Sequence, residues 1–166
     1  MIRETGTGAA FAASEEERQR VDGLLKAYAK MRGGLLPLLH ALQKEIGWVP
    51  DALVPDVADA LNLSRAEVHG VISFYHDFRR KPAGRHVVKL CRAESCQARG
   101  GAAVEAAAQE RFRIAMGETS ADGAVTLEPV YCLGLCSIGP NALVDGKPVA
   151  AIDAAKVDRI AAEVLA

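Results

Sequence analysis

Long apolar runs are missing from this 166-residue sequence. No stretch approaches the roughly 20 consecutive apolar residues that span a bilayer, so we expect no membrane-spanning segment. Residues 1–13 hold one Arg, one Glu and no continuous apolar stretch, which does not resemble a secretory signal peptide. We therefore expect a cytoplasmic location.

An excess of charge of either sign is also missing, because the formal net charge is −1. A basic surface for nucleic acid or for an anionic membrane is therefore not expected. The sequence has neither a G-x-G-x-x-G motif after a predicted strand nor a P-loop, so the chain itself is not expected to bind NAD or ATP. With 50% hydrophobic and 25% charged residues, it has the composition of a soluble globular protein.

Helical signals dominate the first half of the chain, after an N-terminus at 1–14 that we expect to be flexible. Ser14 and Glu17 form a predicted capping box. Apolar residues then recur at helical spacing until Gly33 and Gly34, which end the first predicted helix.

Three further helices are predicted in this half. One runs through residues 35–46, and one begins after an N-cap at Asp51. The last follows a second capping box formed by Ser64 and Glu67. Four short helices with tight connections indicate a compact bundle, which we place at residues 15–80.

Pro82 and Gly84 interrupt this pattern, and strand and helix signals alternate over residues 85–166. The predicted elements are a strand at 86–90, a helix at 102–115, a strand at 125–131, a hairpin around Asp145-Gly146, and a last helix capped by Asp153. This succession of strands and helices indicates a thioredoxin-like domain. The predicted fold class is therefore α+β, a helical bundle followed by a thioredoxin-like α/β domain.

All four cysteines lie in the second predicted domain, as the pairs Cys91/Cys96 and Cys132/Cys136. Each pair starts at the predicted end of a strand and continues into a loop. Adjacent strand ends in one sheet can bring two such loops together, so that four sulfurs converge on one site. Thiolates are soft ligands, and four of them suit either zinc or an iron–sulfur cluster.

The spacing within the pairs favours the cluster. Structural zinc sites usually draw each cysteine pair from a tight knuckle with two to four intervening residues. The gaps of four and three residues here are at the loose end of that range and are better suited to a larger, two-iron object. Two structural disulfides are disfavoured in a cytosolic chain, and the C-x-x-C motif of a thioredoxin-like redox pair is absent. Zinc stays open as the alternative.

Around these cysteines the sequence resembles a known family. Cys91-Arg-Ala-Glu-Ser-Cys96 followed by Cys132-Leu-Gly-Leu-Cys136 is similar to the thioredoxin-like [2Fe–2S] ferredoxins, and more narrowly to the ferredoxin-like subunit of bacterial NADH:quinone oxidoreductase, the complex I family. The resemblance covers roughly residues 15 to 165. Further matching stretches are residues 39–43, 47–50, 64–71, 73–78 and 145–148.

The resemblance implies one [2Fe–2S] cluster and no catalytic residue in this chain. The implied ligands are Cys91, Cys96, Cys132 and Cys136. It also implies an electron-transfer subunit of an NAD-linked oxidoreductase complex, with a flavin- and NAD-binding subunit as partner. A zinc-stabilised interaction module without a redox role is the alternative of a different class.

Three complexes compete within that family. The stretch from Cys91 to Gln97 most resembles the gamma subunit of soluble molybdenum-dependent formate dehydrogenases, because complex I relatives usually carry small and hydroxylic residues where this chain has Arg92 and Glu94. This resemblance implies a second partner, a catalytic subunit with molybdenum and Fe–S centres. The equivalent subunits of complex I and of NAD-reducing hydrogenases are the alternatives.

Other residues are expected to shape or surround the site. Gly134 and Gly139 should let backbone amides approach the sulfurs, and Arg92 and Glu94 are candidates for tuning the reduction potential. We expect packing or surface roles for the four histidines, His40, His69, His76 and His86. We expect the aromatic residues of the helical half to pack within it or against the second domain: Trp48, Phe74, Tyr75 and Phe78.

Overall fold

The computed structural model describes residues 15–165. Its contacts divide the chain into two compact units, with the boundary between Pro82 and Ala83. Ser14 of the first predicted capping box and the N-terminus at 1–14 lie outside the described residues. In the described part, no helix is both long and apolar enough to cross a membrane.

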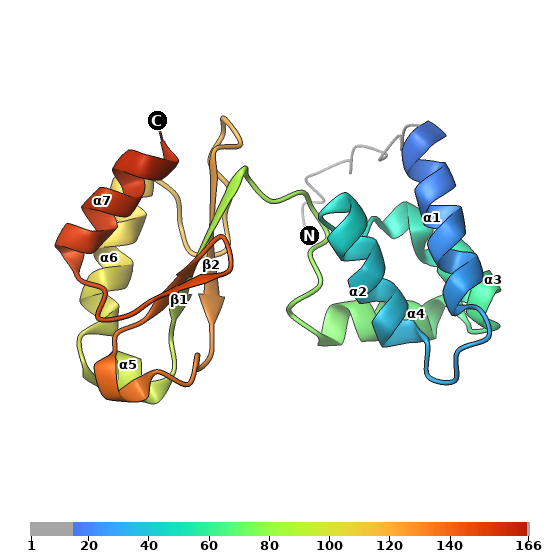
Figure 1. Cartoon of the computed structure of the whole chain (residues 1–166), viewed down its shortest axis with the longest axis horizontal. Helices are drawn as coiled ribbons and strands as arrows, with labels where there is room; N and C mark the ends of the chain where they lie inside the picture. The colour runs from blue at the N-terminus through green and yellow to red at the C-terminus, as the bar shows by residue number, and fades with distance from the viewer. Residues whose placement is uncertain (1–14, 166) are drawn as a thin grey trace, which may run out of the picture. The chain divides into compact units, whose positions relative to one another are not determined.

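The first unit is helical (Figure 1). Its elements are α1 (Glu15–Tyr28), α2 (Leu35–Ile46), the short 3-10 helix η1 (Asp51–Leu53), α3 (Val54–Leu61) and α4 (Arg65–Phe74). Apolar side chains of the four α-helices meet in one core, where Leu38, Leu39 and Leu42 are fully buried. Each such leucine contributes about 1.5–3 kcal/mol to folding. The helical first half predicted from the apolar spacing is confirmed.

The two remaining predicted helix caps differ in outcome. Ser64 Oγ accepts from Glu67 N at 3.2 Å, and Glu67 Oε2 accepts from Ser64 N at 2.8 Å, so this capping box is confirmed. The N-cap predicted at Asp51 is wrong, because Pro50 takes the N-cap position of η1 and no side chain caps it. The Asp51 carboxylate instead accepts from Nε and Nη2 of Arg80. The carboxylate thus makes a two-pronged, charge-assisted contact with Arg80 in place of a helix cap.

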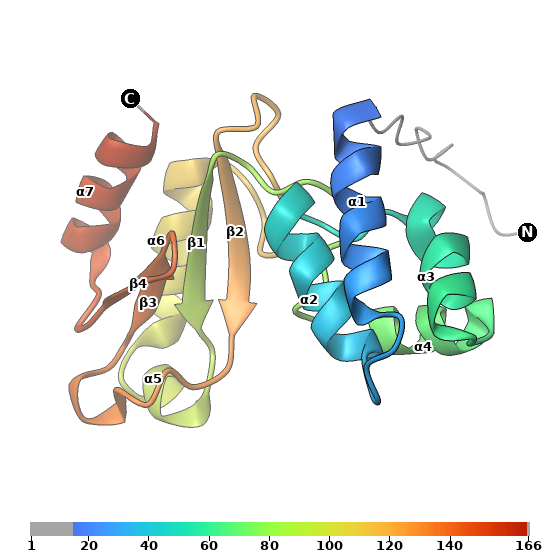
Figure 2. The same ribbon diagram turned by 45° about the vertical axis from the view of Figure 1, so that its right-hand side comes forward.

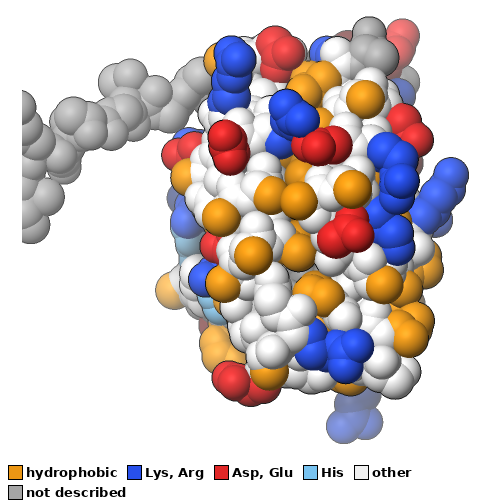
Figure 3. Space-filling model, turned by 90° about the vertical axis from the view of Figure 1, so that its left-hand side faces the viewer, with side chains coloured by type: hydrophobic (Ala, Val, Ile, Leu, Met, Phe, Trp, Pro, Cys, Tyr) orange, Lys and Arg blue, Asp and Glu red, His pale blue; other side chains and the backbone are white. Residues whose placement is uncertain are grey.

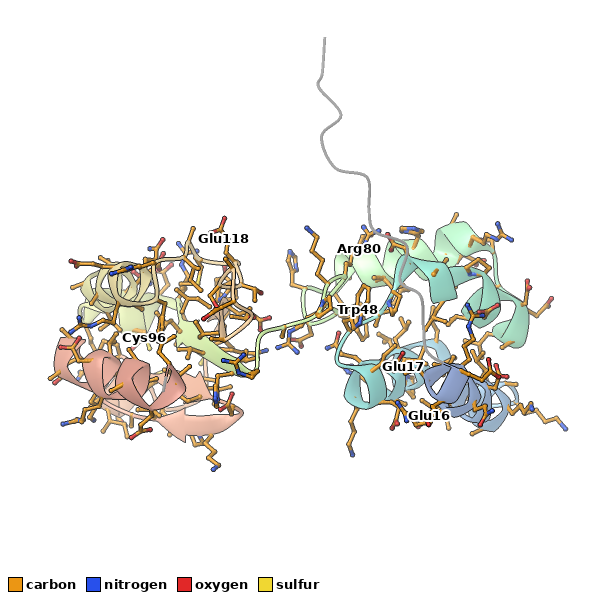
Figure 4. The ribbon with its side chains drawn as sticks, turned by 90° about the horizontal axis from the view of Figure 1, so that it is seen from above. Glu16, Glu17, Trp48, Arg80, Cys96 and Glu118 are labelled. Carbon is orange, nitrogen blue, oxygen red and sulfur yellow. The ribbon has the colours of Figure 1, made fainter. Side chains whose placement is uncertain are left out.

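Gln43 of α2 holds the segment that leaves α4. Its Nε2 donates to Asp77 O and its Oε1 accepts from Arg79 N, both at 2.7 Å. Val49 N adds a bond to Arg79 O at 2.7 Å. Trp48, beside Val49, is labelled at this end of the unit in Figure 4. These bonds fix the exit from the helical unit to its core.

The aromatic side chains of this segment do not share one environment. Phe78 is 5% exposed and belongs to the core, as expected. Phe74 is 73% exposed and meets the Tyr75 ring edge-on at a centroid distance of 5.1 Å, so it does not join the core of this unit. Phe74 is the last residue of α4, where helical spacing predicts the helix but not which face meets solvent.

The second unit is a four-stranded sheet with two long helices, α6 and α7, on one face (Figures 1 and 2). Its elements are β1 (His86–Cys91), α5 (Glu94–Ala98), α6 (Gly101–Phe112), β2 (Val125–Val130), the 3-10 helix η2 (Cys136–Ile138), β3 (Ala142–Val144), β4 (Lys147–Val149) and α7 (Ala154–Val164). The strand order is β2-β1-β3-β4. The thioredoxin-like α/β half of the predicted α+β fold is confirmed.

One parallel pair in this sheet positions the cysteines. β1 and β2 run parallel, with Cys91 opposite Val130, whereas β3 runs antiparallel to β1 and to β4. The carboxyl ends of β1 and β2 therefore meet at the same edge. Buried apolar residues of the sheet, α6 and α7 form one core, with Leu127 and Val125 fully buried. On the face of the molecule that these helices form, acidic and basic side chains are interspersed (Figure 3).

Some boundaries differ from those predicted. The helix predicted at 102–115 ends at Phe112, because Arg113 adopts a left-handed φ of 56°. The residues between Cys91 and Cys96, predicted as loop, include the start of α5. The cap predicted at Asp153 is confirmed, since its Oδ1 accepts from Lys156 N at 2.8 Å.

Candidate metal centre

The four cysteines lie at one edge of the sheet in the second unit. Cys91 is the last residue of β1, and Cys132 follows two residues after the end of β2. Cys96 lies in α5, inside the second unit (Figure 4), and Cys136 begins η2. The predicted strand-end placement thus holds for Cys91, and Cys132 lies just beyond the neighbouring strand end.

The sulfurs form two pairs. Cys132 Sγ and Cys136 Sγ are 3.8 Å apart, and both residues are exposed. Cys91 and Cys96 are 5% and 1% exposed, and the interaction between their thiols lowers the pKa of Cys91 and raises that of Cys96. Among residues 15–165, no three His, Cys, Asp or Glu side chains gather closely enough to surround a single metal ion.

Backbone amides of the second cysteine segment connect the two pairs. Cys132 has a left-handed φ of 68°, and its N–H and that of Leu133 donate to the Cys91 sulfur. Successive N–H groups in such a conformation form a concave anion-binding nest. Burial opposes ionisation of Cys91, but these amides, that of Ala93 and the Cys96 thiol together lower its pKa. A left-handed non-glycine residue costs about 1–3 kcal/mol, which this contact helps to offset.

Cys96 is held by Asn141, a residue that sequence reasoning missed. Burial and the Cys91 thiol raise the pKa of Cys96, while the backbone and side-chain N–H groups of Asn141 oppose that rise. Asn141 Nδ2 lies 3.7 Å from Cys96 Sγ and donates to Leu135 O at 2.8 Å. Exchanging the amide N and O would set an oxygen against both acceptors, so this orientation is the chemically sound one.

The same amide has an unsatisfied end. Asn141 is 2% exposed, and its Oδ1 has no hydrogen-bond partner among the described residues. A buried acceptor without a partner costs about 1–3 kcal/mol. The N–H groups of Asn141 compensate for this cost, because they contact the Cys96 sulfur and bond to the Cys132–Cys136 loop. The sequence signal that could have found it is a polar residue directly before a buried strand.

The two glycines singled out in the sequence act differently. Gly134 has a φ of +77°, which turns the Cys132–Cys136 loop. Gly139 approaches the buried pair, because a Cβ there would lie 3.3 Å from Cys96 Sγ. Arg99 Nε donates to Gly139 O at 2.8 Å and holds this segment in place. Gly139 therefore brings its backbone close to a sulfur, but its N–H donates to Cys136 O at 3.4 Å and not to that sulfur.

The histidines have the packing and surface roles expected of them. The His40 ring packs on Phe78 with centroids 4.9 Å apart, and His69 and His76 are exposed. His86 Nδ1 lies 2.8 Å from Asp145 Oδ2, at the opposite end of β1 from Cys91. That carboxylate also accepts from Val87 N, so the pair fixes the β3–β4 turn to β1.

The donor set suits a two-iron cluster. Four thiolates arranged as two pairs would supply two ligands to each of two irons, and N–H groups directed at the sulfurs are the usual surroundings of such clusters. A single zinc ion requires all four sulfurs to converge on one point. The fold and these residues define a thioredoxin-like domain whose sheet edge can carry a [2Fe–2S] cluster.

The chain belongs to the family of thioredoxin-like [2Fe–2S] ferredoxins, whose family model matches residues 21–165. The family binds one [2Fe–2S] cluster, in agreement with the predicted cofactor. The match extends through both the helical unit and the sheet unit.

Named relatives include subunits of NADH-linked enzymes. The chain is 37% identical to the E subunit of NADH-quinone oxidoreductase from Escherichia coli K12 over 136 residues, which is 82% of each chain. It is 36% identical over 135 residues to the protein of the same name from Pseudomonas aeruginosa, covering 81% of each. A crystal structure of an NAD+-reducing [NiFe]-hydrogenase matches 80% of this chain with a TM-score of 0.68 and 26% identity, but the match spans only 23% of that hydrogenase chain.

Proposed function

We propose that this chain is an electron-transfer subunit with one [2Fe–2S] cluster, held by Cys91 and Cys96 on one iron and by Cys132 and Cys136 on the other. The observation that carries the proposal is the arrangement of the sulfurs in two pairs, joined by the amides of Cys132 and Leu133 at Cys91. When bound, the cluster accepts and releases single electrons.

The chain's own residues position and shield the site. The ends of β1 and β2 hold the two cysteine segments side by side, and α5 buries Cys96. Amides of Ala93, Cys132 and Leu133 stabilise negative charge at Cys91. Electron transfer needs no acid–base side chain, because it depends only on the position and the reduction potential of the cluster.

The partner in this proposal is a flavin- and NAD-binding subunit. Support comes from the named relatives, which belong to NADH-quinone oxidoreductases and to an NAD+-reducing hydrogenase. A flavin converts the two-electron hydride chemistry of NAD into one-electron steps, which a cluster of this kind can receive or supply.

Within this class we favour a formate dehydrogenase complex with a molybdenum- and Fe–S-containing catalytic subunit. The support is the stretch from Cys91 to Gln97, where Arg92 and Glu94 depart from the small residues usual in complex I relatives. Purification of the tagged full chain with its partners tests this choice. Co-purifying molybdenum and formate-dependent NAD reduction are expected. Quinone- or hydrogen-linked activity without molybdenum would assign the chain to one of the other complexes.

The cluster itself is tested on the anaerobically purified full chain. We expect visible charge-transfer absorption and, after reduction, a rhombic electron paramagnetic resonance signal. A colourless protein with zinc bound would show that the chain is a zinc-stabilised module instead.

A further inference from the structure

Arg92, directly after Cys91, is paired with a carboxylate from a different element. Its Nε lies 3.0 Å from Glu105 Oε2 on α6. The Arg92 side chain is 41% exposed and that of Glu105 only 17%. Arg92 was expected to be a candidate for tuning the reduction potential, and the structure shows that its charge is one half of an ion pair.

Both charges are held by backbone that is fixed to the cysteine segment. Arg92 N donates to Val130 O at 2.8 Å, which continues the β1–β2 pairing beyond Cys91. Glu105 lies in α6, whose first residue, Gly101, packs so closely that a Cβ there would lie 2.8 Å from Cys96 O. The backbone positions that carry the two charges are therefore fixed relative to Cys91 and Cys96.

We propose that Arg92 and Glu105 form a charge-compensated pair in which Glu105 cancels the effect of Arg92 on the cluster's reduction potential. This inference rests on the cluster proposed above. Reduction adds one negative charge, which a nearby cation favours and a nearby anion opposes. Because the two groups are adjacent and their backbone is fixed, their opposite fields at the cluster largely cancel.

The other charges of this region are arranged differently. Glu94 is exposed at the start of α5, and Arg99 donates to the Gly139 carbonyl. Neither contributes to the contact between Arg92 and Glu105. Changing one member of that pair therefore leaves the remaining member as the new charge near the cluster.

Reduction potentials of three variants test the pair. Arg92→Gln should lower the potential, and Glu105→Gln should raise it, because each exposes the field of the remaining charge. We expect about a threefold to tenfold change in the ratio of reduced to oxidised protein, tenfold being about 59 mV for a one-electron couple. The double variant Arg92→Gln/Glu105→Gln should return close to the wild-type potential.

A purely structural role makes a different prediction. If the pair only holds α6 against the cysteine segment, both single variants should shift the potential in the same direction or not at all, and either result overturns the inference. Should Arg92→Gln fail to fold, Glu105→Gln is measured by itself, and an unchanged or lowered potential overturns the inference.

Arg111→Gln is the matched control. Arg111 lies on the same helix and pairs with Asp158 of α7 at 2.7 Å, far along α6 from the cysteines. The reduction potential of the Arg111→Gln variant should equal that of the wild-type chain. A wild-type chain without the visible spectrum of a cluster would instead refute the proposed function, so the two failures are distinguishable.

Discussion

The two cysteine pairs of this protein contrast in burial and in support. Cys91 and Cys96 are buried, and their sulfurs accept hydrogen bonds from N–H groups of Ala93, Cys132, Leu133 and Asn141. Cys132 and Cys136 are exposed, on a loop flanked by the exposed Tyr131 and Ile138. One pair therefore belongs to the core of the sheet unit, and the other belongs to its surface.

This difference separates two tasks of an electron-transfer site. Stabilising added negative charge requires fixed donors, which the buried pair has. Exchanging electrons with a partner requires access, which the exposed loop provides. Variants and labelling can test this division, from the largest expected effect to the smallest.

Replacing a proposed ligand of the exposed pair should have the largest effect. Cys132→Ser should lose most of the visible absorption, because a serine oxygen is a harder and poorer ligand for iron than thiolate. The absorbance per chain of anaerobically purified protein measures it. His76→Ala is the control and should keep the wild-type spectrum, since His76 is exposed on the separate helical unit. The reverse pattern would show that the ligand assignment is wrong.

The rate of thiol alkylation should distinguish the two cysteine pairs once iron has been removed from the protein by anaerobic chelation. Cys132 and Cys136 should react with iodoacetamide at least about tenfold faster than Cys91 and Cys96, because access limits the buried thiols. The order of reactivity tests burial against ionisation. The pKa of Cys136 is raised, chiefly by its hydrogen bond to the Cys132 thiol, whereas that of Cys91 is lowered. Mass spectrometry of the peptides measures the rates. Faster labelling of Cys91 would show that ionisation outweighs burial.

Removing the side-chain donor to the buried pair should lower the reduction potential. In Asn141→Leu, the reduced, more negative state loses an N–H at Cys96, so the ratio of reduced to oxidised protein should fall about tenfold, or about 59 mV. A potentiometric titration followed by visible absorption measures it.

Thr126→Val is the matched control for that variant. Thr126 is also buried and bonded, to Thr119 and Gly84 N, but it lies at the far end of β2 from the cysteines. The reduction potential of the Thr126→Val variant should stay at the wild-type value. An unchanged potential in Asn141→Leu would mean that the amide serves only to hold the loop.

The smallest effect should come from the turn of the exposed loop. Gly134→Ala places a Cβ at a φ of +77°, which should lower the free energy of unfolding by about 1 kcal/mol. Nothing lies within 4 Å of that Cβ, so the cluster spectrum should be retained. Anaerobic urea unfolding measures the loss. A loss of several kcal/mol would indicate that this loop is as tightly supported as the buried pair.

Local rules predicted much of this structure from the sequence. Capping chemistry placed the starts of α4 and α7, because Ser64, Glu67 and Asp153 bond within three residues of themselves. Apolar spacing and the geometry of strand ends predicted both the fold class and the edge at which Cys91 lies. Each of these inferences depends on contacts that are close in sequence or on the general geometry of parallel strands.

Tertiary contacts account for what sequence reasoning missed. Asp51 had the residue type of a cap, but a cation 29 residues away took its carboxylate. Arg92 was named as a candidate for tuning the potential, but its partner Glu105 lies on α6, 13 residues further along the chain. Asn141 reaches Cys96 across 45 residues. No local pattern encodes these partners, because each depends on how two elements pack.

The central claim is that four cysteines in two pairs hold two irons. Analysis of iron and acid-labile sulfide in the anaerobically purified full chain tests it most directly. The proposed site predicts two irons and two sulfides per chain, the content of the cluster that the family binds. One zinc per chain, with no sulfide, would contradict it.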